Sequence, residues 1–148
     1  MALVPRFTAQ EVRRQIELEI ARIEKVIIRN LFYLGEECRN NAIENKGYMD
    51  RTSNLKSSIG YIVVANGKVI SRKFETYAAT ATKGELTGEA LAHKIAEEYP
   101  TGYALIVVAG MNYAAKVEST ERNVLRSAEV FAEAELPRML KTLGIRQA

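Results

Sequence analysis

Few side chains in this sequence could do chemistry on a bound molecule. His93 is the one histidine among the 148 residues. A histidine that acts as a general base needs a nucleophile within reach and a third group to orient it, and the surrounding sequence indicates neither. Cys38 is the one cysteine, and its place in a row of apolar residues at helical spacing favours core packing over a reactive thiol. We therefore expect no catalytic role for either residue.

Two further patterns resemble functional motifs without completing them. The acidic pairs Glu36-Glu37 and Glu97-Glu98 fall in predicted helices, where adjacent side chains point in different directions and do not converge on one substrate. The run Gly84-Glu85-Leu86-Thr87-Gly88 lacks the Gly-Lys-Ser/Thr ending of a phosphate-binding loop and does not directly follow a strand. Cysteine and histidine show no metal-ligand spacing. We expect no enzyme activity, no cofactor and no metal site.

The composition predicts a folded, soluble chain forming one domain over residues 1–148. Hydrophobic residues make up 47% and charged residues 26%, which is typical of globular proteins. A single cysteine cannot form an internal disulfide, so we expect a reducing compartment. The longest apolar run, Tyr103 to Ala109, is too short to span a bilayer, and the N-terminus has no apolar core of signal-peptide length.

A long helix is predicted over residues 8–46. Thr8 and Glu11 have capping-box spacing, and Gly47 is placed to end the helix. Apolar residues recur in steps of three and four on one stripe: Val12, Ile16, Ile20, Ile23, Ile27, Leu31, Leu34 and Cys38. Such a helix would be about 57 Å long, which exceeds the width of a small domain. Gly35 or the Asn40-Asn41 pair could break or bend it. If it is unbroken, one end should project and contact something else.

A β-hairpin is predicted over residues 57–74, because Asn66-Gly67 is a strong signal for a two-residue type I′ turn. That turn predicts four cross-strand pairs: Val64–Val69, Val63–Ile70, Tyr61–Arg72 and Ile59–Phe74. Ile59, Tyr61, Val63, Ile70 and Phe74 would then share one face. The opposite face would carry Ile62, Val64 and Val69.

The remaining elements complete an α+β fold with a small antiparallel sheet. We predict a short inserted helix over 85–99, a third strand over 103–109 and a C-terminal helix over 121–142, kinked at Pro137. The strands are apolar on both faces, so either helices wrap the sheet or a second subunit covers one face. We predict that Ile62, Val64 and Val69 form a subunit interface, and that Val64→Asp blocks assembly without unfolding the subunit.

The basic residues leave a second kind of function open. The net charge of +3 permits contact with nucleic acid without requiring it. Lys68, Arg72 and Lys73 form a basic patch along the hairpin edge that could touch phosphates. Lysines on an edge strand also block unwanted strand pairing, which is the simpler explanation. The alternative to a structural role is therefore a nucleic-acid-binding or regulatory module of a mobile element.

Two short runs resemble the head–tail connector proteins of tailed bacteriophages, also called neck or tail-completion proteins. In that family a long first helix precedes an Asp-Thr-Gly-x-Leu-Arg-x-Ser-like turn into a hairpin, and Thr52, Asn54, Leu55, Lys56 and Ser58 fit this turn. Arg51 and Ser53 depart from it, standing where the family often has Asp and Gly. The family's Tyr-Ala-x-x-Val-Glu segment and the Leu-Arg-x-Ala-like start of its last helix are matched at these positions: Tyr113, Ala114, Val117, Glu118, Leu125, Arg126 and Ala128. The family usually has Gly-Thr after the first of these segments, where this chain has Ser119-Thr120.

The resemblance implies a structural role in the virion. Family members assemble as rings, often of six subunits, between the portal of the DNA-filled head and the tail tube. The resemblance therefore implies four kinds of partner: other copies of this chain, portal or adaptor proteins, tail-tube proteins, and DNA that passes through the channel without sequence-specific contacts. Assembly would take place in the host bacterial cytoplasm.

Overall fold

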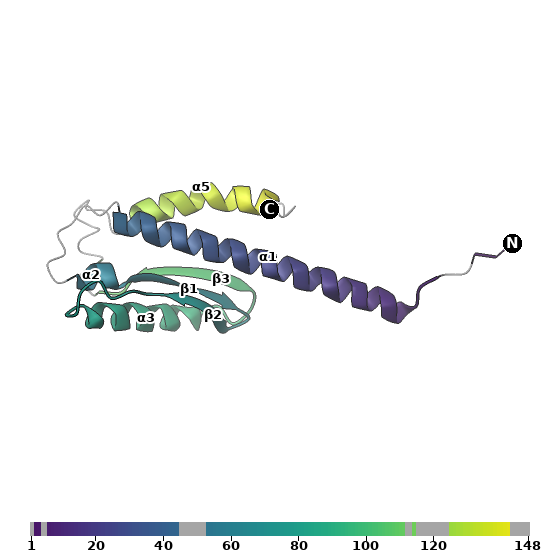
Figure 1. Ribbon diagram of the computed structural model, residues 1–148, viewed down its shortest axis with the longest axis horizontal. Helices are drawn as coiled ribbons and strands as arrows, with labels where there is room; N and C mark the ends of the chain where they lie inside the picture. The colour runs from purple at the N-terminus through teal and green to yellow at the C-terminus, as the bar shows by residue number, and fades with distance from the viewer. Residues whose placement is uncertain (1, 4–5, 45–52, 112–113, 115–124, 143–148) are drawn as a thin grey trace.

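The computed structural model describes residues 2–3, 6–44, 53–111, 114 and 125–142 (Figure 1). The order of elements is α1 (Ala9–Glu44), α2 (Asn54–Ser57), β1 (Ile59–Ala65), β2 (Lys68–Lys73), α3 (Thr82–Ala96), β3 (Tyr103–Ala109) and α5 (Arg126–Thr142). The strands form one antiparallel sheet in the order β2-β1-β3. The predicted α+β fold is confirmed, with its long first helix, three-stranded sheet, inserted helix and C-terminal helix.

The elements stack in layers around the sheet (Figure 1). Helix α3 covers one face, the C-terminal half of α1 covers the other, and α5 packs along the far side of α1. The N-terminal half of α1 extends beyond all the other helices and strands. The sheet is therefore wrapped on both faces within one chain, which is one of the two arrangements that its doubly apolar strands predicted.

Helix α1 is one unbroken helix of 36 residues. Its predicted capping box is confirmed: the Glu11 backbone N–H donates to Thr8 Oγ1 over 3.1 Å, and the Thr8 N–H donates to Glu11 Oε2 over 3.0 Å. Gly35 does not interrupt the helix. A Cβ atom at that position would lie 2.6 Å from the Tyr61 ring, so glycine lets α1 approach the sheet closely. The predicted end at residue 46 lies outside the described residues.

The register of the hairpin differs from the prediction beyond its first pair. Asn66 and Gly67 have the positive φ values of a type I′ turn, 50° and 80°, and Val64 pairs with Val69 as expected. A β-bulge next to Val64 then shifts the register by one residue, and the pairs become Val63–Ser71, Ile62–Arg72 and Tyr61–Lys73. The predicted pairings of Val63 with Ile70, of Tyr61 with Arg72 and of Ile59 with Phe74 are therefore wrong. A bulge adds a residue to one strand, and turn chemistry does not reveal it.

The bulge also changes the face on which two apolar side chains lie. Phe74 packs in the core beneath α3, on the face opposite to the one predicted. Ile70 is 43% exposed on the edge strand β2, next to the outward-facing Lys68 and Arg72. The strand β1 starts at Ile59, two residues later than predicted, because the preceding residues form the short helix α2.

The glycines of the run 84–88 are packing residues. Helix α3 begins at Thr82 and ends at Ala96, so the predicted span 85–99 is shifted by three residues at each end. A Cβ at Gly84 would lie 2.0 Å from the Asn54 carbonyl oxygen, and one at Gly88 would lie 2.3 Å from the Ser58 carbonyl oxygen. The two glycines thus let α3 lie directly against the α2–β1 junction.

The predicted subunit interface on the sheet is wrong. Ile62 and Val64 are fully buried inside the chain, and Val69 packs partly buried against the same core. Small residues on α3, including Ala92 and Ala96, let the helix sit close enough to cover this face completely. The apolar pattern required a cover, and the chain's own inserted helix provides it.

Helix α5 continues as a single helix through Pro137. Its predicted start at residue 121 lies outside the described residues. Along this helix Ala128 is buried, and Ala132 and Met139 are partly buried against the core cluster that includes α1, whereas Leu136 is exposed. Helix α5 therefore lies as an outer layer on α1, with one narrow apolar face turned inward.

Candidate assembly interface

The first family-like run forms the joint between α2, α3 and β1. Asn54 Oδ1 accepts a hydrogen bond from the Gly84 N–H over 3.0 Å, and Ser58 Oγ donates to the Leu55 carbonyl over 2.7 Å. Leu55 is buried in the core beneath α1, and the Lys56 ammonium lies 4.1 Å from the centroid of the Tyr77 ring. The structure brings these four positions together as a structural joint. Thr52 lies outside the described residues.

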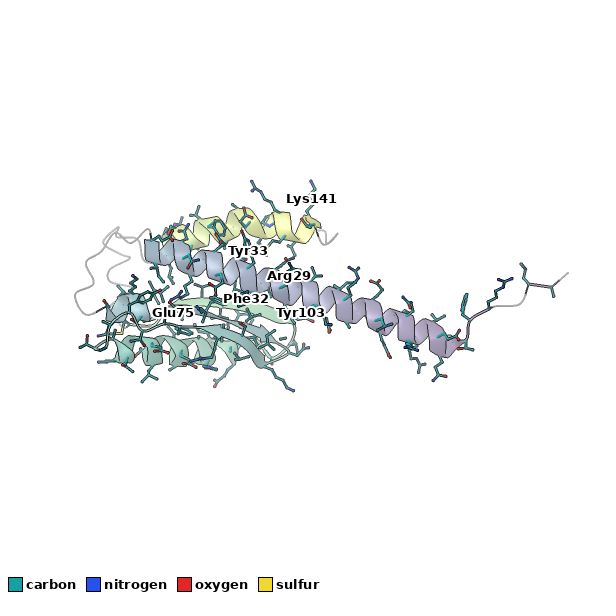
Figure 2. The ribbon with its side chains drawn as sticks, viewed as in Figure 1. Arg29, Phe32, Tyr33, Glu75, Tyr103 and Lys141 are labelled. Atoms are coloured by element: carbon teal, nitrogen blue, oxygen red, sulfur yellow. The ribbon has the colours of Figure 1, made fainter. Side chains whose placement is uncertain are left out.

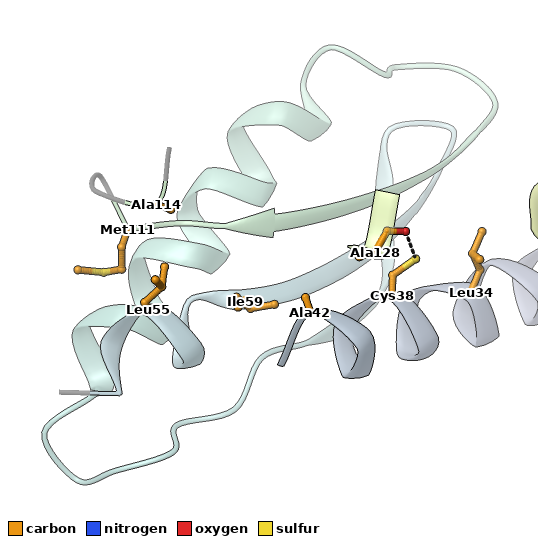
Figure 3. Packing of buried hydrophobic residues seen from close by; sticks show 8 residues of the cluster. All are labelled: Leu34, Cys38, Ala42, Leu55, Ile59, Met111, Ala114 and Ala128. Atoms are coloured by element: carbon orange, nitrogen blue, oxygen red, sulfur yellow. Dashed lines mark hydrogen bonds between the residues drawn. The ribbon is translucent and has the colours of Figure 1, made fainter. Parts of the chain in front are cut away.

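The second family-like run is described only in part. Tyr113, Val117 and Glu118 lie outside the described residues. Figure 3 shows Ala114 and Ala128 in one core cluster that also includes Leu34, Cys38, Ala42, Leu55, Ile59 and Met111. The Cys38 Sγ donates a weak hydrogen bond to the Ala128 carbonyl over 3.7 Å, and Leu125 packs against the same cluster. Arg126 is exposed and pairs with Glu129 over 2.8 Å. These positions fix α5 to α1.

A polar cluster ties α1 to the sheet beside that core. The Arg39 side chain is buried, and its Nη2 donates to Tyr77 Oη over 2.7 Å and to Glu75 Oε2 over 3.3 Å. The Tyr61 hydroxyl donates to Glu36 Oε1 over 2.7 Å, and its pKa is raised, first by burial and then by that hydrogen bond. These hydrogen bonds join α1 to β1 and to the segment that follows β2.

The predicted basic patch is largely paired with carboxylates. Arg72 makes a two-pronged contact with Glu89, at 2.7 and 2.9 Å, and Lys73 lies 2.8 Å from Glu75. The pKa of Glu89 is lowered, mainly by the hydrogen bond that it accepts from Arg72. His93 is exposed, with Nε2 3.7 Å from the same Glu89 carboxylate. The structure thus brings His93 to a surface salt-bridge group, where its nearest charged partner is already engaged.

The described part of the chain was compared with the requirements of a metal site and of a membrane-spanning helix. Among residues 2–3, 6–44, 53–111, 114 and 125–142, no three or more His, Cys, Asp or Glu side chains gather as a metal site would need. Within these same ranges no helix combines the length and apolar character needed to cross a membrane.

The most unusual surface is the projecting half of α1. Every residue from Ala9 to Lys25 is exposed, and most of this stretch, which is about 25 Å long, extends beyond the packed layers (Figure 2). Its apolar side chains share one face and lie open to solvent: Val12 at 40%, Ile16 at 55%, Ile20 at 50% and Ile23 at 42% of their surface. We call these four residues the projecting stripe. Contiguous apolar surface of this kind marks an interaction site.

A second feature is an apolar groove between β3 and α5, with a volume of about 570 Å³. Its lining consists mainly of small and branched apolar residues: Cys38, Leu105, Val107, Ala109, Ala128 and Ala132. Two charged residues of α5, Arg126 and Glu129, also line the groove. We call this feature the α5–β3 groove. The groove was not predicted from the sequence, because it forms only where α5 lies against α1 and faces β3.

Comparisons of this chain with protein-family models, with curated proteins and with solved structures find no match.

Cys38 is expected to be inert in the folded chain. Burial, with a smaller contribution from Glu37, raises the pKa of its thiol to about 11. At pH 8 about one thiol in a thousand would be ionised, and the side chain is also shielded from reagents. We expect no reaction with a thiol-specific dye over an hour in buffer and complete reaction in urea. Rapid labelling of the folded chain would show that the α1–α5 core opens readily.

Proposed function

We propose that this chain is a structural subunit that assembles with copies of itself into a ring at the head–tail joint of a tailed bacteriophage. In this proposal the ring joins the portal or adaptor to the tail-tube protein, and DNA passes through its channel. The subunit would be made in the host bacterial cytoplasm and end in the virion.

The projecting stripe is the observation that carries this proposal. The helix begins in solvent and is held by the core only from its middle onward, so its N-terminal half contributes little to the folding of its own subunit. Four branched apolar side chains on one face of such a helix remain in water unless another molecule covers them. A helix face presented in this way is a common means of protein–protein recognition.

The expected strength of one such contact favours a closed assembly over an isolated pair. Burying the exposed part of each stripe residue stabilises a complex by about 1 kcal/mol. Association costs an estimated 4–15 kcal/mol in lost rotational and translational freedom. The stripe residues together gain only about the lower end of that cost, so two subunits joined by a single stripe contact would associate weakly. Closing a ring adds a further contact with no additional subunit to immobilise, which makes the closed form the stable product.

The resemblance in sequence supports a head–tail connector ring as the kind of assembly. The Ser53 backbone has φ 58°, a left-handed conformation that glycine adopts most easily. Family members often have glycine at this position, so their sequences suit the turn seen here. The other matched and described positions, among them Asn54, Leu55 and Ala128, are those that build the joint and the α1–α5 core.

The native mass of the purified chain tests this proposal. We expect masses that rise with concentration to a closed species of about six subunits, seen as rings by electron microscopy. A chain that stays monomeric up to millimolar concentration, both alone and with portal or tail-tube protein, would contradict the proposal. Tight, salt-dependent DNA binding by such a monomer would instead support the nucleic-acid-binding module.

A further inference from the structure

We propose that the α5–β3 groove of one copy receives the projecting stripe of the next copy. This inference rests on the proposed self-assembly and adds the surface that accepts the helix. The occupant is a defined segment, the α1 residues from Val12 to Ile23 of a second chain. The projecting stripe is an exposed row of large apolar side chains on one helix face, and the groove is an apolar hollow on the described chain.

The stripe cannot reach the groove of its own subunit. Cys38 lies in the wall of the groove, and Ile20 lies on the same continuous helix. At a rise of about 1.5 Å per residue, the two positions are separated by about 27 Å along the axis. A rigid helix cannot fold back over that distance. The helix that enters the groove must therefore come from another molecule.

The sizes of the side chains on the two surfaces are complementary. The groove presents Ala109, Ala128 and Ala132, which leave space above the backbone. The stripe presents Ile16, Ile20 and Ile23, which are large and branched. Large side chains on one helix inserting between small ones on another element give close packing between the two surfaces.

The stripe also continues an interface that exists within the subunit. Leu34 and Cys38 belong to the same apolar row of α1, and they already pack against Ala128 of α5. Helical spacing places Ile16, Ile20 and Ile23 on the same side of the helix. The incoming stripe therefore repeats, on a neighbouring molecule, the kind of contact that α5 makes with its own α1.

Two different surfaces meet in this arrangement, so the contact is heterologous. Each copy offers one stripe and one groove, and each can bind two neighbours. Repetition of such a contact gives a ring when the rotation closes. Pairing of one stripe with another would instead give a two-fold or bundled species that leaves the groove unused.

Two variants that block one surface each can test the direction of the contact. Ile20→Asp disrupts the stripe, and Glu129→Trp covers the groove from an exposed position without replacing a core residue. We expect each variant to be monomeric at concentrations where the parent chain assembles. A mixture of the two should form no rings and at most weak one-to-one dimers at high concentration, because only one intact stripe and one intact groove can meet. Val130→Trp, which places the same side chain on α5 outside the groove, should assemble as the parent does.

A cross-link keeps the test decisive if a variant folds poorly. In a Cys38→Ala background, Ile20→Cys together with Glu129→Cys should give disulfide-linked ladders under mild oxidation, and either cysteine alone should not. If Glu129→Trp assembles normally and no ladder forms, the groove assignment is wrong while assembly through the stripe stands. If the parent chain stays monomeric both alone and with portal or tail-tube protein, both proposals fail.

Discussion

The double variant Ile16→Asp/Ile20→Asp is expected to keep the fold of the subunit and to lose its self-association. Both side chains are about half exposed and contact no packed layer, so the core keeps its contacts. Removing two branched side chains from the buried contact and desolvating two carboxylates should weaken association by about 100-fold or more. Sedimentation velocity over a wide concentration range measures this change, and circular dichroism with thermal unfolding reports on the fold.

Leu18→Asp is the matched control for this double variant. Leu18 is 56% exposed on the same projecting segment, yet helical spacing puts it on the side opposite to the stripe. Its replacement carries the same change in charge and a similar cost in helix propensity. We expect association close to that of the parent chain. Equal loss of association in Leu18→Asp and the double variant would mean that helix stability or charge, and not the stripe, controls assembly.

Val64→Asp is expected to unfold the subunit. Val64 is fully buried between the sheet and α3, in a cluster of apolar side chains. The substitution removes a packed side chain and places a carboxylate where no described basic group pairs with it, at a cost of about 4 kcal/mol or more. That is a large part of the roughly 5–15 kcal/mol that stabilises a typical domain. Urea unfolding followed by circular dichroism would measure the loss.

Ile70→Asp provides the comparison on the neighbouring strand. Ile70 is 43% exposed on the edge strand β2, so an aspartate there stays hydrated. We expect a change in unfolding free energy within about 0.5 kcal/mol, which is usual for surface sites. A Val64→Asp chain that remained folded and lost only its assembly would restore the sheet face as a subunit interface and contradict the wrapped sheet described above.

The elements that follow from local chemistry could be predicted from the sequence. The reciprocal capping box of Thr8 and Glu11, the Asn66-Gly67 turn and the third strand all depend on residues close together in the chain. The continuity of α1 through Gly35 could not be predicted in this way. The reason for a glycine at this position lies in the Tyr61 ring, which belongs to another element and occupies the space that a side chain would need.

For a related reason, the sequence did not predict which element covers the sheet, nor did it predict the α5–β3 groove. The pattern at Ile62 and Val64 showed that a cover was needed and left open whether it came from the same chain. The answer depends on how closely Gly84 and Gly88 let α3 approach the α2–β1 junction. The α5–β3 groove depends likewise on docking between elements. The exposed stripe, in contrast, follows from the apolar spacing and the length of the predicted helix.

The backbone hydrogen exchange of residues 9–25, compared at low and high protein concentration, tests the central claim most directly. In the dilute monomer every side chain of this helical segment is exposed, so we expect its amides to exchange rapidly. On assembly we expect their exchange to slow by at least about 10-fold, while the sheet amides change little. Rapid exchange in this segment at every concentration, in samples whose mass has risen to that of an oligomer, would show that the projecting stripe does not hold the subunits together.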